Sequence, residues 1–403
     1  MHEVFIYDGI RTAFGRHGGA LAGVRPDELL ARTIRELVKR NNFDGSLVED
    51  VVAGDTNQAG EDARNVARNA ALLAGLPTSV GGATVNRLCG SGAAAALDCA
   101  RAIKCKEGHL MIAAGVENMS RSPWVIAKAE APYSRTQEMF DSTIGWRFPN
   151  PRLLKEYGND SMAETADNIA RDLGITRADS DAYAWASQQR YAAARVDGFY
   201  QDEIMAIEVP GASRKDPVIV IAADEHPRPD TTLEKLASLK PIYAGGVVTA
   251  GNASGINDGA GALLLGCRDM GEKLGLQARA RIITGAVAGV DPRIMGLGPV
   301  PAAQKALQRA GLALKDMDVI EINEAFATQV LGVLKQLQLS MQDSRINPNG
   351  GAIAIGHPLG ASGIRLILTA MRQLERGKGR YALVSLCIGI GQGIALILER
   401  VDK

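Results

Sequence analysis

One short motif occurs twice in the 403-residue chain, and this repeat limits the folds that the chain can adopt. CGSG at Cys89–Gly92 and GASG at Gly360–Gly363 lie 271 residues apart, and each opens a pattern typical of a helix. Sixteen positions after its last glycine, each pattern reaches another glycine (Gly108 and Gly379), and an apolar strand-like run follows. We interpret the match as a diverged duplication. It predicts two α/β layers of similar topology with a cleft between them.

The segments around the repeat support this interpretation. Residues 1–120 alternate β-branched runs with amphipathic helical patterns, which is typical of a doubly wound α/β layer, and the alternation resumes at about residue 282. After about residue 119 the composition changes to Pro, Ser, aromatic and charged residues, and two helical patterns follow at 163–174 and 177–198. We interpret this part as an inserted loop-and-helix region, the kind of segment that often binds ligands.

Charge and cysteine content exclude several classes of protein. Lys and Arg total 45, as do Asp and Glu, so no basic surface for nucleic acid or for a membrane is indicated. The apolar run at Val4–Tyr7 is too short for a signal peptide, and no stretch approaches the roughly 18 apolar residues of a membrane helix. The five cysteines include no CxxC pair. We therefore expect a cytoplasmic protein with reduced thiols and no bound metal.

Cys89 is the first candidate for chemistry. It stands between the strand-like GATVN and an Ala-rich helical pattern, and a helix N-terminus lowers the pKa of a thiol. Gly90 and Gly92 would let a substrate approach the backbone, whose N–H groups can form an oxyanion hole. The alternative is that Cys89 is a small buried side chain in an Ala-rich contact, and the junction alone does not decide between the two.

Three further side chains could work with a nucleophilic cysteine. Among five histidines, His357 alone lies between glycines ahead of a helix start, so it is the candidate base. Asn323 follows a strand-like run and is either a helix N-cap or an amide that holds a water at an enolate oxygen. Cys387 ends an apolar strand and either packs there or moves a proton. We place Cys89, Asn323 and His357 at strand-to-helix junctions, which meet at one edge of a parallel sheet.

Together these motifs resemble those of the thiolase family. NRLCGSG, NEAFA, GHPLGASG and CIGIGQG occur in the family's order, TAGNASGINDGAGALLL resembles another thiolase signature, and the similarity runs from about residue 3 to residue 400. The resemblance implies an α/β thiolase fold of duplicated halves in five αβαβα layers with an inserted loop domain. It divides the chain into 1–120 plus 247–272, a loop domain at 121–246, and 273–403.

The resemblance also implies a role for each group. Cys89 resembles the nucleophile that becomes acylated, and His357 the group that takes its proton and then helps to bind the enolate oxygen. Cys387 resembles the acid/base that exchanges a proton at the α-carbon or at the CoA sulfur. Asn323 resembles the residue that holds a water at the enolate. The backbone N–H groups of Cys89 and Gly389 resemble the oxyanion hole of the tetrahedral intermediate.

Other positions resemble family contacts to the substrate. Ser254 matches a pantetheine-side contact, Arg228 a cation near the nucleotide end of CoA, and Met162 a residue of the acyl pocket. Family members often carry His where this chain has Ser161, and many carry Gly where it has Ile390. The family implies CoA as a co-substrate with no permanently bound cofactor, acyl-CoA thioesters as ligands, and a homodimer or homotetramer.

Residues 139–168 resemble the 3-oxoadipyl-CoA thiolases of aromatic-compound catabolism more than acetoacetyl-CoA thiolases. This resemblance implies an acyltransferase that cleaves 3-oxoadipyl-CoA with CoA to succinyl-CoA and acetyl-CoA through an acyl-Cys89 intermediate. A terminal carboxylate needs a cation in the acyl pocket. Arg147 is the candidate, and the alternative is a solvated loop arginine.

Other functions stay open at this point. The first alternative substrates are acetoacetyl-CoA and 3-ketoacyl-CoA in general. A decarboxylating ketoacyl synthase shares the fold, but it typically uses Cys with two histidines, where this chain has Asn323 and Cys387. A non-catalytic acyl-CoA-binding or thiol-sensing protein is the alternative from another class.

Overall fold

The computed structural model describes residues 2–211 and 216–402. The strands of the first half are β1 (Phe5–Thr12), β2 (Gly15–Arg16), β3 (Asp50–Gly54), β4 (Gly81–Val85), β5 (Leu110–Asn118) and β11 (Asn257–Gly266). Those of the second half are β12 (Ala280–Gly289), β13 (Val319–Ile322), β14 (Tyr381–Ile388) and β15 (Gln392–Arg400). The helices around them are α1 (Pro26–Asn41), α2 (Val66–Leu73), α3 (Ser91–Cys105), α8 (Arg268–Leu274), α9 (Pro299–Ala310), α10 (Ala327–Gln336), α11 (Ala352–Ile355) and α12 (Leu359–Gly377).

These strands form one mixed sheet in the order β13–β14–β15–β12–β1–β11–β5–β3–β4. The two halves join where Phe5 and Ile6 of β1 pair with Arg281 and Ala280 of β12. The prediction of a doubly wound parallel layer is wrong in part. In the first half, β3 is parallel to β4 and β5, but β11 runs antiparallel to β5 and to β1. In the second half, β13 is parallel to β14, and β15 runs antiparallel to β14.

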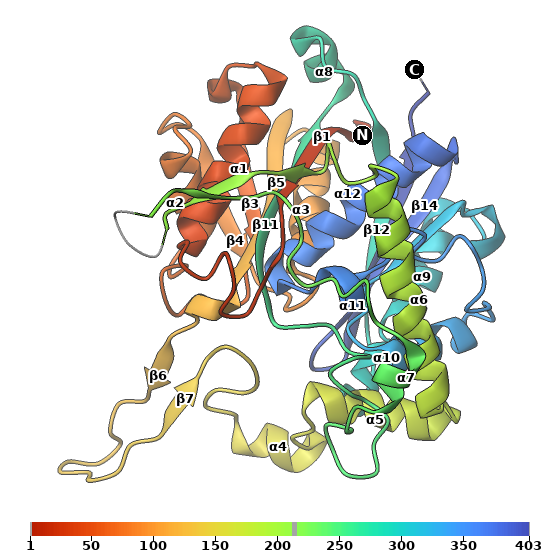
Figure 1. Cartoon of the computed structure of the whole chain (residues 1–403). Helices are drawn as coiled ribbons and strands as arrows, with labels where there is room; N and C mark the ends of the chain where they lie inside the picture. The colour runs from red at the N-terminus through yellow and green to blue at the C-terminus, as the bar shows by residue number, and fades with distance from the viewer. Residues whose placement is uncertain (1, 212–215, 403) are drawn as a thin grey trace.

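Helices complete five layers around the two half-sheets (Figure 1). α1 and α2 cover the outer face of the first half, and α9 and α10 cover that of the second. α3 and α12 pack against each other between the halves, within one apolar core that draws side chains from both sheets. The predicted αβαβα arrangement is therefore confirmed. The predicted cleft between the layers is wrong, because these two helices fill that space.

The repeated motifs lie where α3 and α12 cross. A Cβ at Gly92 would lie 2.5 Å from the backbone oxygen of Gly360, and one at Gly363 would lie 2.2 Å from the backbone nitrogen of Ala93. The glycines therefore allow α3 and α12 to approach each other closely. The expectation that Gly92 lets a substrate approach the backbone is wrong. The strands that follow the helices, β5 and β14, begin at Leu110 and Tyr381, again 271 residues apart.

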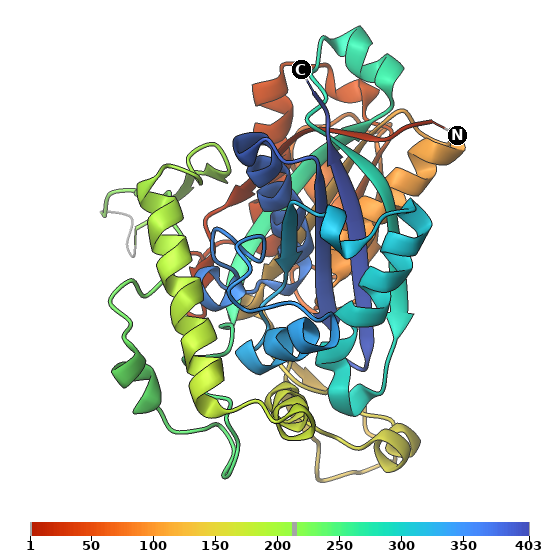
Figure 2. The ribbon, with the colours of Figure 1, turned by 90° about the vertical axis from the view of Figure 1, so that its right-hand side faces the viewer.

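Residues after β5 form an excursion from these layers. Its elements are β6 (Trp124–Ile126), β7 (Met139–Asp141), α4 (Pro151–Tyr157), α5 (Met162–Leu173), α6 (Arg177–Val196), β8 (Ile204–Met205), β9 (Ile207–Val209), β10 (Ile219–Ile221) and α7 (Leu233–Ala237). The β6–β7 hairpin projects from the body of the molecule, and α6 runs beside α10 and α11 (Figure 2). The two predicted helices are confirmed as α5 and α6, and both begin with capping boxes. Within the described ranges no helix is long and apolar enough to cross a membrane.

Candidate active site

A locked turn places Cys89 ahead of α3. Ser91 Oγ accepts the N–H of Arg87 at 2.8 Å and donates to the carbonyl of Leu88 at 2.6 Å. Leu88 takes the left-handed conformation, with φ 45°, and Gly90 caps the helix. Cys89 itself is half-buried, and the backbone N–H of Gly389, from the loop after β14, reaches its sulfur.

The acidity of this thiol differs from the expectation. Burial raises the pKa of Cys89 to about 11, while the N–H groups of Gly389 and of Cys89 itself oppose the shift. The expected lowering by the helix N-terminus is wrong for the substrate-free protein. The thiol is protonated at neutral pH and needs a base to react.

His357 is held in a form suited to that task. Its backbone N–H donates to Asn257 Oδ1 at 2.9 Å, and its Nδ1 lies 2.6 Å from Ser362 Oγ. The Ser362 hydroxyl already gives its single proton to the carbonyl of Pro358 at 2.8 Å, so it must accept from His357 Nδ1–H. Nε2 therefore carries the lone pair. Burial, and then the charge of Arg365, lower the pKa of His357 to about 3, so the ring is neutral.

The segment before His357 is not the expected strand. Residues Ala352–Ile355 form the single turn α11, and Gly356 follows with φ 107°, a value that suits glycine. His357 therefore lies at a helix-to-helix junction. A short apolar run between glycines fits either a strand or a buried helical turn, and the sequence does not distinguish them.

Asn323 lies beside His357. It follows β13, donates its backbone N–H to the carbonyl of Ser385 at 2.9 Å, and places Nδ2 3.3 Å from His357 Nε2. It is not a helix N-cap, because α10 begins at Ala327 with Phe326 as its cap. Its Oδ1 is buried without a hydrogen-bond partner among the described residues, as suits an acceptor for a water or a substrate atom.

Cys387 approaches the same place from β14. It is 1% exposed and packs with Met295 and Ala325. Burial raises the pKa of Cys387 well above that of an ordinary thiol, and the neighbouring Cys89 adds to the shift. Two thiols whose charges affect each other suit two successive proton steps better than two simultaneous thiolates.

The loop after Cys387 and the start of α5 enclose the two thiols. A Cβ at Gly389 would lie 3.3 Å from Leu88 Cδ1 and 3.5 Å from the sulfur of Met162. Ile390 has φ 64°, a conformation that costs a non-glycine residue about 1–2 kcal/mol. Glycine would adopt this conformation without that cost, which is why glycine suits position 390. Ile390 lies in an exposed loop, where its side chain has room.

Of the remaining positions named from the sequence, Ser254 lies near the Asn323 loop, Ser161 caps a helix and Arg228 is exposed. Ser254 lies against the Asn323 loop, since its backbone N–H donates to the carbonyl of Ala325 at 2.9 Å. Ser161 caps α5 and accepts the N–H of Glu164 at 3.2 Å. Arg228 is exposed, and nothing in its contacts ties its side chain to the thiols.

Arg147 is held by two hydrogen bonds rather than free. Its Nη1 donates to Asn57 Oδ1 at 3.2 Å and to the carbonyl of Ser142 at 2.8 Å, at the base of the β6–β7 hairpin. These contacts half-bury the side chain. They hold Nη1 in place and leave the rest of the guanidinium half-exposed.

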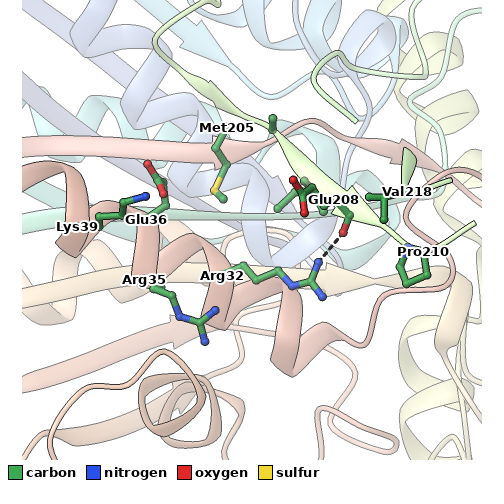
Figure 3. A pocket seen from close by; sticks show the side chains of 10 residues that line it. Arg32, Arg35, Glu36, Lys39, Met205, Glu208, Pro210 and Val218 are labelled. Carbon is green, nitrogen blue, oxygen red and sulfur yellow. Dashed lines mark hydrogen bonds between the residues drawn. The ribbon is translucent and has the colours of Figure 1, made fainter. Parts of the chain in front are cut away.

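A pocket of about 430 Å³ lies elsewhere, between α1 and the β9–β10 hairpin (Figure 3). None of the predicted site residues lines it. Its arginines are already used to hold the fold, because Arg32 donates to the carbonyl of Glu208 at 2.8 Å and Arg35 donates to the carbonyls of Leu73 and Ala74. Among the described residues no group of three His, Cys, Asp or Glu side chains is placed to hold a metal.

Sequence reasoning missed Ser362, Asn257 and Glu324. Ser362 is part of the repeated GASG, Asn257 of the GIND stretch, and Glu324 of NEAFA, so each lay inside a motif but was assigned no role. The signal that could have identified Ser362 is its spacing, since it lies one helical turn beyond Pro358 and faces back along α12. Asn257 accepts a hydrogen bond from His357, and Glu324 accepts hydrogen bonds from Tyr183 and Ser187. These partners are distant in sequence, so no local spacing indicates them.

Comparison with known proteins agrees with this arrangement. The Thiolase, N-terminal domain family matches residues 4–269, and the Thiolase, C-terminal domain family matches residues 276–400. The chain is 58% identical to a beta-ketoadipyl-CoA thiolase of Escherichia coli over 403 residues, covering all of both chains. It is 57% identical to the 3-oxoadipyl-CoA/3-oxo-5,6-dehydrosuberyl-CoA thiolase of Escherichia coli strain K12, again over the whole of both.

A solved structure gives the same result for the fold. Human mitochondrial 3-ketoacyl-CoA thiolase in complex with CoA is 39% identical and superposes with a TM-score of 0.91, over 99% of this chain and 98% of that one. Five sequence motifs and the five-layered fold agree with these matches. The chain belongs to the thiolase family.

Proposed function

We propose that this thiolase cleaves 3-oxoadipyl-CoA with CoA to give succinyl-CoA and acetyl-CoA, as a step in the catabolism of aromatic compounds. The observation that carries the substrate is the identity of 57–58% over the whole chain to two thiolases named for it. The chemistry is supported by the arrangement of Cys89, His357, Asn323 and Cys387.

In the first half of the reaction, Cys89 attacks the β-keto carbon of the substrate. His357 Nε2 takes the thiol proton as the carbon–sulfur bond forms, and the N–H groups of Cys89 and Gly389 bind the oxyanion. Collapse breaks the bond between the α- and β-carbons and leaves a succinyl group on Cys89. General-base assistance contributes about 10²–10⁴-fold and an oxyanion donor about 3 kcal/mol.

The leaving group is the enolate of acetyl-CoA. The enolate oxygen accepts a hydrogen bond from His357 Nε2–H, which now carries the proton of Cys89. Asn323, whose Nδ2 lies 3.3 Å from His357 Nε2, holds a water at the same oxygen. Cys387 gives its proton to the α-carbon and becomes a thiolate, and acetyl-CoA leaves. The raised pKa of Cys387 suits the step that follows, because its thiolate readily takes a proton from the CoA thiol.

In the second half, CoA takes the acyl group. Cys387 removes the proton of the CoA thiol, and the CoA sulfur attacks the thioester on Cys89. The same two N–H groups bind the oxyanion. The carbon–sulfur bond to Cys89 then breaks, succinyl-CoA leaves, and His357 returns its proton to Cys89. All protons are balanced, so CoA is a co-substrate and no resident cofactor enters the cycle.

We also propose where the substrate lies. Met162 and Ser254, which flank the thiols and the Asn323 loop, receive the acyl and pantetheine parts, and Arg228 receives the nucleotide end of CoA. Arg147 receives the distal carboxylate, with Asn57 and Ser142 fixing its orientation. The remaining parts of the proposal are the division into 1–120 plus 247–272, 121–246 and 273–403, a homodimer or homotetramer, and a cytoplasmic location.

The test compares two substrates in the presence of CoA, with products followed by mass spectrometry. We expect rapid release of succinyl-CoA and acetyl-CoA from 3-oxoadipyl-CoA, a weaker response to acetoacetyl-CoA, and loss of nearly all turnover in Cys89→Ser. Arg147→Met should slow 3-oxoadipyl-CoA at least tenfold more than acetoacetyl-CoA, because one charge-assisted pair is lost. Equal losses would exclude the role of Arg147, and a preference for acetoacetyl-CoA would exclude the substrate.

A further inference from the structure

Glu324 follows Asn323 directly, yet the reaction scheme gives it no part. It is 0% exposed, and its carboxylate accepts four hydrogen bonds. Their donors are Tyr183 Oη at 2.9 Å, Ser187 Oγ at 2.7 Å, Asn347 Nδ2 at 2.9 Å and the backbone N–H of Ile353 at 3.1 Å. An ionised carboxylate has about four acceptor positions, so its capacity is filled.

The four donors come from three separate segments. Tyr183 and Ser187 lie on α6, Asn347 on the loop after α10, and Ile353 on α11, four residues before His357. The carboxylate therefore ties the residue after Asn323 to the segment that leads into His357. Each donor is separated from Glu324 by 23 to 141 residues of chain, so the contacts restrain the tertiary arrangement and not a local turn.

The segment around Asn347 is pressed against this carboxylate. A Cβ at Gly351 would lie 2.3 Å from the carboxyl carbon of Glu324, so the loop approaches as closely as a backbone can. Asn347 also accepts from the N–H of Ile322 at 2.8 Å and donates to the carbonyl of Ile322 at 2.9 Å. β13, the loop and the carboxylate thus form one rigid unit.

His357 has supports of its own. Ser362 holds its ring and Asn257 its backbone, independently of Glu324. What Glu324 adds is the position of Asn323 relative to that ring, a separation of 3.3 Å between Nδ2 and Nε2. The other oxyanion hole uses N–H groups of Cys89 and Gly389, from loops that make none of these contacts.

We infer that Glu324 is a positioning residue for the enolate site, whose four hydrogen bonds set Asn323 against His357. This inference rests on the proposed thiolase chemistry, but not on the identity of the acyl substrate. It predicts a selective defect. Loss of the carboxylate should impair formation of the enolate more than transfer of the acyl group between Cys89 and CoA, because that transfer uses the other hole.

The experiment uses acetyl-CoA as the probe for two exchange reactions of the full-length protein. Exchange of labelled CoA into acetyl-CoA measures acyl transfer through Cys89, and exchange of the methyl protons of acetyl-CoA with D₂O measures enolate formation. For Glu324→Gln we expect proton exchange to fall about 10²-fold, as for the loss of one oxyanion donor, with CoA exchange reduced less than tenfold. Equal losses in both reactions, or no loss in either, would overturn the inference.

Two further variants complete the test. Glu203→Gln changes another fully buried glutamate, held by Arg11 and Thr369, and should leave the ratio of the two rates at the wild-type value. If Glu324→Gln does not fold, Ser187→Ala removes one donor and should lower the ratio several-fold, and an unchanged ratio would overturn the inference. A wild-type protein that catalyses neither exchange would instead contradict the proposed function.

Discussion

Replacing Ser362 with alanine tests the assignment of the histidine tautomer. Ser362 Oγ accepts from His357 Nδ1 at 2.6 Å, and the serine is 1% exposed. In Ser362→Ala the Nδ1–H has no acceptor in a buried place, since His357 is itself 4% exposed. The neutral ring then favours the tautomer with the proton on Nε2. That tautomer cannot accept the proton of Cys89.

The size of the effect follows from this single lost bond. Leaving a buried donor unsatisfied costs about 1–3 kcal/mol, and this energy acts against the productive tautomer alone. A penalty of that size corresponds to a reduction of about 5- to 150-fold. It should appear in the rate of acylation of Cys89 and in kcat/KM, whereas binding of CoA should not change, because the ring does not hold the nucleotide.

The assay is single-turnover acylation of Cys89 by an acyl-CoA, followed by mass spectrometry of the intact protein. Ser362→Thr keeps the hydroxyl and should restore most of the rate. Ser180→Ala is a matched control, because Ser180 is equally buried and also donates to the carbonyl four residues before it, on α6. Acylation of Ser362→Ala at the wild-type rate would refute the tautomer argument, whatever its melting temperature.

Two further predictions concern the thiol and the helix crossing. Because the pKa of Cys89 is raised to about 11, its thiolate fraction and its rate of alkylation by iodoacetamide should rise about tenfold per pH unit between pH 7 and 10, and a plateau already reached at pH 7 would contradict this. Gly363→Ala should lower the free energy of unfolding in denaturant titrations by about 1–3 kcal/mol or more, because its Cβ meets the backbone of α3 at 2.2 Å. Gly377→Ala, at the end of the same helix with 3.6 Å to its nearest atom, should change it by less than about 0.5 kcal/mol, and equal effects would show that the crossing is not tightly packed.

The pairing of α3 with α12 and the helices α5 and α6 could be predicted because short motifs mark them. The 271-residue repeat marks the pair α3 and α12, and capping residues at Ser161 and Thr176 mark α5 and α6. Strand direction could not be predicted in the same way. β11 follows the long excursion and pairs antiparallel to β1 and β5, and nothing in its apolar sequence distinguishes that pairing from a parallel one.

The acidity of the proposed catalytic groups was the least predictable part of the site. From the sequence, Cys89 has a helix after it, and that alone favours a thiolate. The rise in the pKa of Cys89 comes from the water that the fold removes from the sulfur, and the N–H of Gly389, 300 residues later in the chain, only partly opposes it. The same holds for His357, whose pKa is lowered by burial in the core rather than by its neighbours in GHPLG.

The residues proposed to contact the substrate could therefore be predicted from the sequence, whereas the residue proposed to position them, Glu324, could not. Cys89 and His357 each stand next to a glycine ahead of a helix, and Asn323 directly follows β13; such places can be read from short motifs. The role of Glu324 depends on counting donors from α6, from the loop after α10 and from α11, and none of these segments identifies its acceptor by itself. A carboxylate beside a catalytic amide looks like one more acid/base candidate in the sequence. The four filled acceptor positions instead favour a structural role for its carboxylate, which agrees with the proposal that the two thiols and the histidine carry the proton transfers.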